Sequence, residues 1–349
     1  MIRFVQGDLF ASDAEAVVNT VNCVGVMGKG IALQFKKAYP DNFKAYSEGC
    51  KNGAVVPGQV FVFDRGTMTP PRYIINFPTK RHWKEASRIA DIRSGLVSLK
   101  DQIKRFNISS IAIPPLGCGN GGLNWRDVRA AIEHELASLD LVDVIVYEPA
   151  GAPSPASMVI RTAQPKLTLL KAALLDAIRQ YTELDFSLTR LEIQKIAYFL
   201  NESWPGYKLD YAAGKYGPFS TKLEHTLQDM DGHWLIGCGD NADPRTEISL
   251  SDMAAEAVEQ FMAKYDPATP YIKSKNRALK VIHGFETPFG MELLSTTHWL
   301  AVHNVPPAAN VDEAYTMIQN WNQHKKDLFD RAHVACAWAR LKDYGWINR

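Results

Sequence analysis

The sequence predicts an α/β domain whose sheet carries helices on both faces, followed by a mostly α-helical second domain. In the first domain, segments typical of strands alternate with segments at helical spacing through residues 1–149. This alternation indicates β–α–β crossovers and a sheet that is covered on both faces. The second domain is predicted from amphipathic helical patterns, which recur through residues 166–345.

The first domain is expected to contain strands and helices in a regular order. The expected strands are residues 2–8, 15–22, 58–64, 72–79, 108–117 (where the strand runs into a loop) and 143–149. The expected helices are residues 30–40, 88–107 and 125–139. The first of these helices is expected to stop at Pro40, because proline cannot continue a helix.

A small, proline-rich and uncharged segment, residues 149–157, separates the two parts. We expect a first domain over residues 1–152, a linker over 153–163 and a second domain over 164–349. The expected helices of the second domain are residues 166–184, 189–203, 254–265, 311–330 and 331–345, with one short β-like patch near 232–239. Thr189 and Glu192 have the spacing of a capping box.

Composition narrows the class of protein. The hydrophobic content of 46% and the charged content of 22% are typical of a globular protein. No apolar run reaches transmembrane length, the N-terminus has no signal-peptide pattern, and the five cysteines are scattered, so a cytoplasmic protein is expected. We expect no cofactor and no metal site, since His298 and His303 are five residues apart, the wrong spacing for a helical zinc pair.

Charge is distributed unevenly. Residues 1–150 carry 18 Lys and Arg against 15 Asp and Glu, whereas residues 151–349 carry 21 against 23. Residues 224–259 contain nine acidic residues and a single Lys or Arg residue, Arg245. This local acidic field can select a basic partner, and an ordinary solvated surface is the alternative.

Two glycine-rich loops each leave a strand and enter a helix. The first loop lies within residues 18–35, with Gly25, Gly28 and Gly30, and the second is "PLGCGNGGL", residues 115–123. Glycine lets backbone N–H groups approach an anion closely, and a diphosphate is a natural ligand for such a loop. Neither loop matches a Walker A motif or the GxGxxG fingerprint. A glycine loop without a ligand is the alternative.

Four polar residues at strand ends are candidates for ligand contacts. Asn19 and Asn22 are suited to ribose hydroxyls, or they are turn residues that bond their own backbone. Asp8 can accept a hydrogen bond from the adenine amine, or it caps a helix. Lys80 is a candidate nucleophile or charge stabiliser in the same crevice, with a solvated surface lysine as the alternative.

The stretches "GDLF", "AVVNTVNCVGVMGKGIALQFKKAYP" and "IAIPPLGCGNGGLNW" resemble the macrodomain family, and the resemblance covers residues 1 to about 150. It implies a three-layer α/β/α macrodomain fold with a mixed sheet that binds ADP-ribose. "GVMGKGIA" with "NFPTK" is more narrowly similar to the DarG antitoxins. In the second domain, "LEIQKIAYFLN" and "KYGPFS" are similar to the C-terminal module of that family and to SocA-like domains.

The resemblance implies a set of site residues. The catalytic residues would be Lys80 and Asn22. The ADP-ribose site would be formed by Asp8, Leu9, Asn19, Asn22, Gly28, Gly30, Ile31, Thr79, Gly117, Cys118, Gly119, Asn120, Gly121, Gly122, Leu123 and Tyr147. A rim of Arg81, His82, Trp83 and Lys84 would contact DNA, with an exposed helix entry as the alternative. Asp229, Asp231, Asp240 and Asp243 are candidates for toxin contacts.

The implied function is that of an antitoxin with a DNA-repair activity. Its macrodomain would remove ADP-ribose from thymine in single-stranded DNA, and its second domain would bind the partner toxin DarT, a DNA ADP-ribosyltransferase. Lys80 would attack C1″, form an imine with the opened sugar, or stabilise the departing base; a nucleophilic role requires a lowered lysine pKa, from burial or from Arg81. The alternatives are a non-catalytic ADP-ribose reader, a toxin-binding protein without turnover, and a hydrolase for other ADP-ribose linkages.

Overall fold

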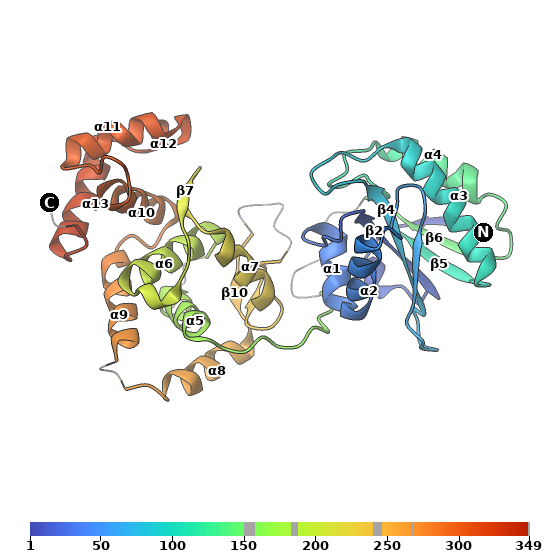
Figure 1. The fold of residues 1–349 in the computed structure, drawn as a ribbon, viewed down its shortest axis with the longest axis horizontal. Coiled ribbons are helices and arrows are strands. Elements are labelled where there is room, and N and C mark those ends of the chain that lie inside the picture. Colours follow the sequence, from blue (N-terminus) through green and yellow to red (C-terminus); the bar gives the residue numbers. More distant parts are fainter. Residues whose placement is uncertain (150–157, 183–187, 240–245, 267–268, 348–349) are drawn as a thin grey trace. The chain divides into compact units, whose positions relative to one another are not determined.

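The computed structural model describes residues 1–149, 158–182, 188–239, 246–266 and 269–347. The chain forms two compact units, Met1–Ala163 and Gln164–Arg349 (Figure 1). None of the described helices combines the length and the apolar character needed to span a membrane.

A six-stranded mixed sheet forms the centre of the N-terminal unit. Its strand order is β1-β6-β5-β2-β4-β3, in which β3 alone is antiparallel to its neighbour. The strands are β1 (Ile2–Val5), β2 (Ala16–Asn22), β3 (Phe61–Asp64), β4 (Tyr73–Lys80), β5 (Ser110–Ile113) and β6 (Asp143–Tyr147). Five parallel strands therefore end at the same edge of the sheet.

Helices cover both faces of this sheet, as Figure 1 shows. The helices are α1 (Gly30–Ala38), α2 (Pro40–Lys51), α3 (Ile89–Arg105) and α4 (Trp125–Leu136), with a short 3-10 helix, η1 (Leu9–Ala11). Strand β5 shows how the sequence builds two cores: Ile111 and Ile113 pack with α3 and α4, whereas Ala112 packs on the opposite face with residues of α1. Side chains alternate between the faces of a strand. The predicted three-layer α/β/α fold is thus confirmed.

Helix α2 was not expected from the sequence. The helix that precedes it ends at Ala38, as the proline predicts, but a new helix begins at Pro40 itself. Proline is favoured in the first turn of a helix, where its missing N–H has no helical partner to lose. The same residue therefore ends one helix and starts the next.

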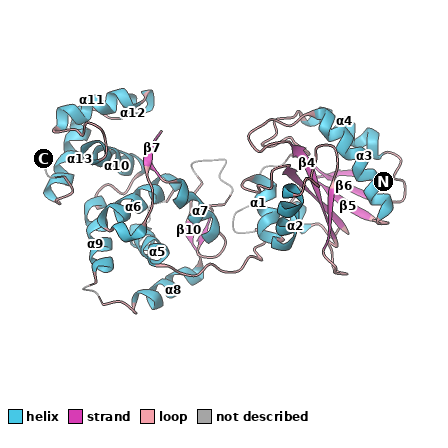
Figure 2. Cartoon of the chain, in the orientation of Figure 1, coloured by secondary structure: helices cyan, strands magenta, loops and turns pink. Residues whose placement is uncertain are grey.

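The C-terminal unit is mostly helical (Figure 2). Its helices are α5 (Leu169–Thr182), α6 (Arg190–Ser203), α7 (Thr221–Met230), α8 (Asp252–Met262), α9 (Pro270–Ile282), α10 (Pro288–Val302), α11 (Val311–Trp321), α12 (Gln323–Leu328) and α13 (Arg331–Asp343), with a short 3-10 helix, η3 (Pro205–Tyr207). Two short sheets pair β7 (Ala212–Gly214) with β8 (Gly217–Phe219), and β9 (Leu235–Ile236) with β10 (Ser249–Leu250).

Two sequence predictions for this unit have opposite outcomes. The capping box of Thr189 and Glu192 is present at the start of α6. The single helix expected over residues 311–330 is wrong, because the chain breaks at Asn322, which ends α11 and starts α12. The Asn322 side chain accepts a hydrogen bond from the Lys325 N–H at 2.9 Å, so it serves as an N-cap.

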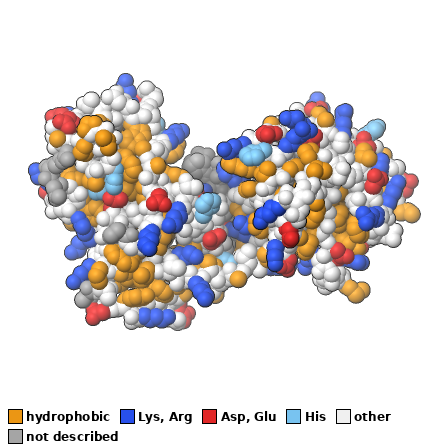
Figure 3. Space-filling model, viewed as in Figure 1, with side chains coloured by type: hydrophobic (Ala, Val, Ile, Leu, Met, Phe, Trp, Pro, Cys, Tyr) orange, Lys and Arg blue, Asp and Glu red, His pale blue; other side chains and the backbone are white. Residues whose placement is uncertain are grey.

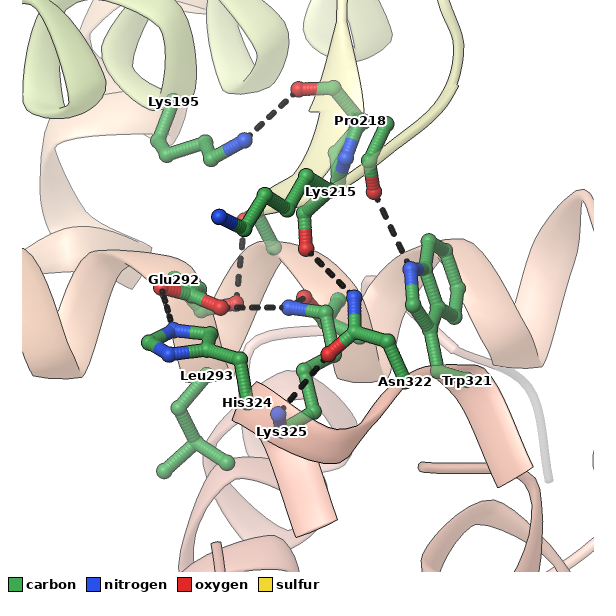
Figure 4. A network of polar contacts seen from close by, with 12 residues as sticks. Lys195, Lys215, Pro218, Glu292, Leu293, Trp321, Asn322, His324 and Lys325 are labelled. Atoms are coloured by element: carbon green, nitrogen blue, oxygen red, sulfur yellow. Dashed lines mark hydrogen bonds and ion pairs between the residues drawn. The ribbon is translucent and has the colours of Figure 1, made fainter. Parts of the chain in front are cut away.

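A buried network of charged side chains lies beneath the β7–β8 hairpin (Figure 4). The Nζ of Lys325 donates to Oε1 of Glu292 at 2.6 Å and to Oγ1 of Thr296 at 2.9 Å. The Nζ of Lys195 donates to the carbonyl of Pro218 at 2.7 Å. Burial, with the neighbouring Lys325 as a second cause, lowers the pKa of Lys195 to about 7.

The hairpin is also fixed from the side of α11 and α12. Trp321 Nε1 donates to the carbonyl of Gly214 at 3.0 Å, and Asn322 Nδ2 donates to the carbonyl of Lys215 at 2.9 Å. The "KYGPFS" motif, residues 215–220, therefore forms the turn and second strand of an anchored hairpin. Gly217 has a φ of +88°, which favours glycine at this turn.

Candidate functional site

Four of the predicted site residues and the second glycine-rich loop lie at the carboxyl-terminal edge of the sheet. Asp8 follows β1, Tyr147 ends β6, the loop 114–123 follows β5, Asn22 ends β2 and Lys80 ends β4. Parallel α/β sheets bind their ligands at this edge. The strand order places Asp8 and Tyr147 at one end of the edge, and Asn22 and Lys80 toward the other.

The two glycine-rich loops meet beside Lys80. We call residues 23–29 the ribose loop and residues 117–123 the glycine loop. A Cβ on Gly30, at the end of the ribose loop, would lie 3.1 Å from Nδ2 of Asn120 in the glycine loop. The Nζ of Lys80 donates a hydrogen bond to the carbonyl of the same Asn120. Lys80 therefore lies where both loops come together.

A register shift sets the position of Lys80. Val21 pairs with Pro78, but the next residue, Asn22, pairs with Lys80, so the β2–β4 ladder has an irregularity at that point. The extra residue, Thr79, is buried and donates its hydroxyl to the Val21 carbonyl at 3.4 Å. Bulges of this kind are frequent beside active sites, where they redirect a side chain.

Asn22 holds the ribose loop in shape. Its Oδ1 accepts hydrogen bonds from the N–H groups of Val24 at 3.0 Å and Val26 at 3.4 Å, and its Nδ2 donates to the Val26 carbonyl. The buried Tyr46 hydroxyl donates to the Asn22 carbonyl at 2.7 Å. No sequence motif had singled out Tyr46. The Asn22 amide is therefore engaged within its own loop, which corresponds to the turn alternative.

Asn19 lies inside the N-terminal unit. It is fully buried, and its Nδ2 donates to Oδ1 of Asn76 at 3.0 Å. Asn76 in turn donates to Oδ1 of Asn42 at 2.7 Å. A fully buried amide has no surface to offer a ribose, so the structure places Asn19 behind the site instead of in contact with ligand.

Close packing explains two glycines of the glycine loop. A Cβ on Gly121 would lie 2.2 Å from Oγ of Ser87 and 2.3 Å from the carbonyl of Gly117. Gly117 has a φ of +69° and also packs on Ser87. The Ser87 N–H donates to the Gly121 carbonyl at 2.9 Å. Ser87, which the sequence did not single out, thus supports the loop from below.

The other side of the glycine loop is open. A Cβ on Gly119 or Gly122 would meet no atom within 4 Å. Within the described part of the chain, the N–H groups of Gly119, Asn120 and Gly121 donate to no acceptor. Consecutive free N–H groups form a concave anion site. Cys118 and Leu123 flank this surface and pack partly against the core of α3 and α4.

The start of α1 adds further donors beside the ribose loop. Its N-cap residue, Lys29, provides no side-chain cap. The first N–H groups of a helix lack helical acceptors and attract negative charge. Gly30 has a φ of +61°, Gly28 makes only an ordinary contact with Val26, and Ile31 is half-buried against the core. This helix end is thus suited to a phosphate.

Asp8 and Tyr147 lie at the same end of the edge, Asp8 after β1 and Tyr147 at the end of the neighbouring strand β6. Val5 and Tyr147 are partners in the β1–β6 ladder, and a Cβ on Gly7 would lie 3.9 Å from the Tyr147 ring. Oδ1 of Asp8 caps η1 by accepting the Phe10 N–H at 2.9 Å. No described residue bonds to Oδ2 of Asp8. This carboxylate therefore serves as a helix cap and keeps one oxygen for a ligand amine. Leu9, the next residue, is buried.

The two cysteines of the site are poor nucleophiles. Burial raises the pKa of both Cys23, in the ribose loop, and Cys118, in the glycine loop, to about 11. Cysteine attacks as a thiolate. Both side chains therefore remain neutral thiols near neutral pH, and residues 22–30 contain no carboxylate. Lys80 is the amine that lies where the two loops meet.

Only part of the expected DNA-binding rim is free to contact DNA. Arg81 forms two hydrogen bonds with the Asp91 carboxylate, at 3.1 and 3.0 Å, so its charge is offset. His82 stacks on Trp83, and Lys84 lies over the same indole at 4.9 Å from its centroid. Trp83 is 50% exposed. Figure 3 shows basic, acidic and apolar side chains intermixed on the visible face of this unit, without one broad basic field.

The acidic candidates of the C-terminal unit divide into three cases. Asp229 is exposed on α7. Asp231 is 5% exposed, and its Oδ1 accepts the Cys238 N–H at 2.8 Å, so the expectation of a surface contact is wrong for this residue. Asp231 instead stabilises the chain segment that follows α7 through this hydrogen bond. Asp240 and Asp243 lie outside the described residues.

One group of described side chains has the donor set of a metal site. Glu202 on α6, His298 on α10 and the adjoining His303 offer ligand atoms that all lie within 4.8 Å of one another. The Tyr198 hydroxyl already hydrogen-bonds His298 Nδ1 at 2.7 Å, and His303 Nε2 bonds Oε2 of Glu202 at 2.8 Å. The spacing of these residues along the sequence did not reveal that they lie close together. Each of the three side chains therefore already has a hydrogen-bond partner within the protein, and His298 is the buried member of the group.

Comparison with known proteins identifies the family. The Macro domain family model matches residues 18–132. The DNA ADP-ribosyl glycohydrolase of Thermus aquaticus is 44% identical over 100% of this chain and 95% of its own length. A DNA ADP-ribosyl transferase–DNA ADP-ribosyl glycohydrolase fusion protein of Thermosipho africanus is 34% identical over 42% of each chain. The structure described as the macrodomain of Mycobacterium tuberculosis DarG is 53% identical, with a TM-score of 0.42, over 43% of this chain and 99% of that one. The chain therefore belongs to the DarG family of DNA ADP-ribosyl glycohydrolases.

Proposed function

We propose that the N-terminal unit removes ADP-ribose from thymine bases in single-stranded DNA. The observation that carries this proposal is the position of Lys80. It pairs with Asn22 across an irregular ladder and donates to the Asn120 carbonyl, where the ribose loop meets the glycine loop. An ADP-ribose reader needs the loops but has no need of a lysine at their junction.

The edge of the sheet has the dimensions of an extended dinucleotide. Five parallel strands span four gaps, or about 19 Å at roughly 4.8 Å per gap. We place adenine near Asp8 and Tyr147, the diphosphate on the free N–H groups of residues 119–121 and close to the start of α1, and the distal ribose between Asn22 and Lys80. Asn22 acts here as a positioning residue, because its amide fixes the ribose loop.

The proposed reaction is hydrolysis of the bond between ribose C1″ and a thymine nitrogen. The bonding electron pair leaves with the base, water oxygen bonds to C1″, and a water proton neutralises the released base. A lysine ammonium beside the departing base stabilises its negative charge. In the alternative role, the neutral Lys80 amine bonds to C1″ while the thymine leaves with the bonding electron pair, and water then hydrolyses the imine formed with the opened sugar. Both roles require the Lys80 nitrogen at this position.

The DNA strand would contact the rim beside Lys80. Trp83 presents half of its surface to solvent, and Lys84 lies over its ring. Bases stack on exposed aromatic rings in single-stranded DNA sites. Arg81 contributes less than its charge suggests, because Asp91 holds it.

We propose that the C-terminal unit binds the partner toxin, DarT, in the cytoplasm. A relative from Thermosipho africanus is named as a fusion of a DNA ADP-ribosyl transferase with a glycohydrolase, which supports pairing of the two activities. Among the described residues between 224 and 259, five acidic side chains are exposed: Asp229, Glu247, Asp252, Glu256 and Glu259. Such a surface favours a basic partner, as the DNA-binding cleft of a transferase would be.

The first test is whether the full chain turns over its substrate. A thymidine-ADP-ribosylated oligonucleotide is incubated with excess protein, and free ADP-ribose and unmodified oligonucleotide are separated and quantified. We expect equal amounts of both products. Tight binding of ADP-ribose without release would support the non-catalytic reader and overturn the proposed hydrolysis.

A further inference from the structure

The C-terminal unit contains a basic groove that the proposed function does not use. A groove of about 420 Å³ is lined by Lys273, Asn276, Arg277 and Lys280 of α9 and by Tyr344, which follows α13. We propose that this groove, together with the adjacent Arg340, binds the phosphates of single-stranded nucleic acid. We call the five lining residues and Arg340 together the α9 groove.

Helix spacing brings the cations of α9 into one row. Lys273, Arg277 and Lys280 are separated by four and three residues, so they share one face of the helix. They are about 6 and 4.5 Å apart along the axis, at 1.5 Å per residue. The opposite face of α9 is buried, with Tyr271, Ser274, Ala278, Val281 and Ile282 in the interior. Packing therefore directs the row of charge to solvent.

Carboxylates do not neutralise this row. Arg277 Nη2 donates to the Gly345 carbonyl at 2.7 Å, and the guanidinium lies over the Trp346 ring at 4.6 Å. Arg340 donates to the His283 carbonyl. Within the described part of the chain, Lys273 and Lys280 have neither an ion pair nor a hydrogen bond from their side chains. Each of the four cations thus retains its charge toward an incoming anion.

The nearby acids are engaged or lie outside the lining of the groove. Glu286 bonds His283 at 3.0 Å and the N–H of Gly284. Asp343 is exposed on the last turn of α13, but it is not part of the groove lining. The excess of positive charge is local, since residues 151–349 as a whole carry more acids than bases.

The exposed ring of Tyr344 favours single-stranded over duplex nucleic acid as the ligand. Tyr344 is 45% exposed, and the Arg340 guanidinium lies 5.2 Å from its ring centroid. A ring supported by an arginine can stack on an unpaired base while the cations contact phosphates. A duplex keeps its bases stacked within the helix and cannot use such a ring. The combination therefore favours a single strand.

This inference is independent of the proposed hydrolysis, because no residue of the α9 groove belongs to the macrodomain. The test measures binding of an unmodified, fluorescein-labelled single-stranded oligonucleotide to the full chain by anisotropy at several salt concentrations. The variant is Lys273→Glu with Lys280→Glu. The matched control is Lys166→Glu with Lys326→Glu, which changes the net charge equally at two exposed lysines elsewhere in the same unit.

We expect the α9 groove variant to bind at least tenfold more weakly than the control. Its slope of log affinity against log salt should be shallower by about 1.4, because each phosphate contact on a single strand contributes about 0.7. Tyr344→Ala should weaken binding without changing that slope. Circular dichroism melting checks that each variant is folded.

Equal affinity and slope in the groove variant and the control would overturn the assignment. Displacement of the oligonucleotide by poly-glutamate at equal charge concentration would also overturn it, in favour of an acidic protein partner. Hydrolysis of an ADP-ribosylated mononucleotide, measured on the same variants, separates failure of the groove from failure of the macrodomain.

Discussion

Lys80 lies opposite Asn22 in the β2–β4 ladder because the register shifts by one residue between Val21 and Asn22. In an unshifted ladder Thr79 would face Asn22, and the Lys80 side chain would project to the other face of the sheet. The shift thus places a lysine on the same face as the residue that shapes the ribose loop. The chemistry that we propose depends on this pairing.

Replacement of Gly121 by alanine should destabilise the N-terminal unit. The new Cβ would collide with Ser87 Oγ and with the Gly117 carbonyl. Overpacking of this kind costs about 1–3 kcal/mol. Urea unfolding of the full chain measures the loss, and calorimetry measures the accompanying loss of ADP-ribose affinity. Gly119→Ala is the control for stability, since its Cβ meets open space. Equal stability of the two variants would refute the packing explanation.

The C-terminal unit should lose stability in mild acid. Burial lowers the pKa of His298 from 6.5 to about 3. Between these values the unfolded chain binds a proton that the folded chain does not bind. The stabilisation is therefore present above pH 6.5 and is lost as the pH falls toward 3. At pH 5 this group alone accounts for about 2 kcal/mol. Urea unfolding followed by tryptophan fluorescence at pH 7 and pH 5 tests this.

His298→Gln is the comparison for that experiment, because glutamine does not titrate and retains a hydrogen-bonding partner for the Tyr198 hydroxyl. We expect the variant to lose less stability than the parent between pH 7 and pH 5. An identical loss in both proteins would show that other groups cause the pH dependence.

Replacement of Glu292 by glutamine should be strongly destabilising. Glu292 is 3% exposed and bonds the buried Lys325, and Lys195 is a second buried amine nearby (Figure 4). Removing the carboxylate leaves buried positive charge without a partner, at a cost of about 3–5 kcal/mol. Glu259→Gln, at an exposed position, is the control and should unfold like the parent. The network explanation fails if both variants have the same midpoint in urea.

Charge reversal on the acidic surface should weaken toxin binding. Asp229→Lys with Glu256→Lys removes exposed negative charge from α7 and α8. The loss should be largest at low salt, because exposed charges are screened at high salt. Asp101→Lys with Asp140→Lys makes the same change of charge on the N-terminal unit. Calorimetric titration with DarT compares the two pairs, and equal affinities would exclude the acidic surface as the binding site.

The sequence predicted the parts of the fold that depend on repeating patterns. Alternation of side chains in β5 and helical spacing in α3 reflect burial on one face, which a single segment already encodes. The order of motifs along the chain was enough to indicate the macrodomain family. Pro40 illustrates the limit, since proline fits the end of one helix and the start of another.

Site details that depend on distant residues were not predictable. The hydrogen bond from Lys80 to Asn120 joins positions 40 residues apart, and Ser87 supports Gly121 across a similar separation. Asn19 looked accessible because it sits near a strand end, yet the Asn76 amide pairs with it in the interior. No local pattern encodes these contacts.

A single-turnover measurement on Lys80→Ala tests the role of Lys80 most directly. The variant and the parent, each in excess over a thymidine-ADP-ribosylated oligonucleotide, are compared by the rate of ADP-ribose release, and their ADP-ribose affinities are measured by calorimetry. The proposed role of Lys80 in the chemical step predicts at least a hundredfold slower release with an affinity within a few-fold of the parent. Release at the parent's rate would contradict a catalytic role for Lys80.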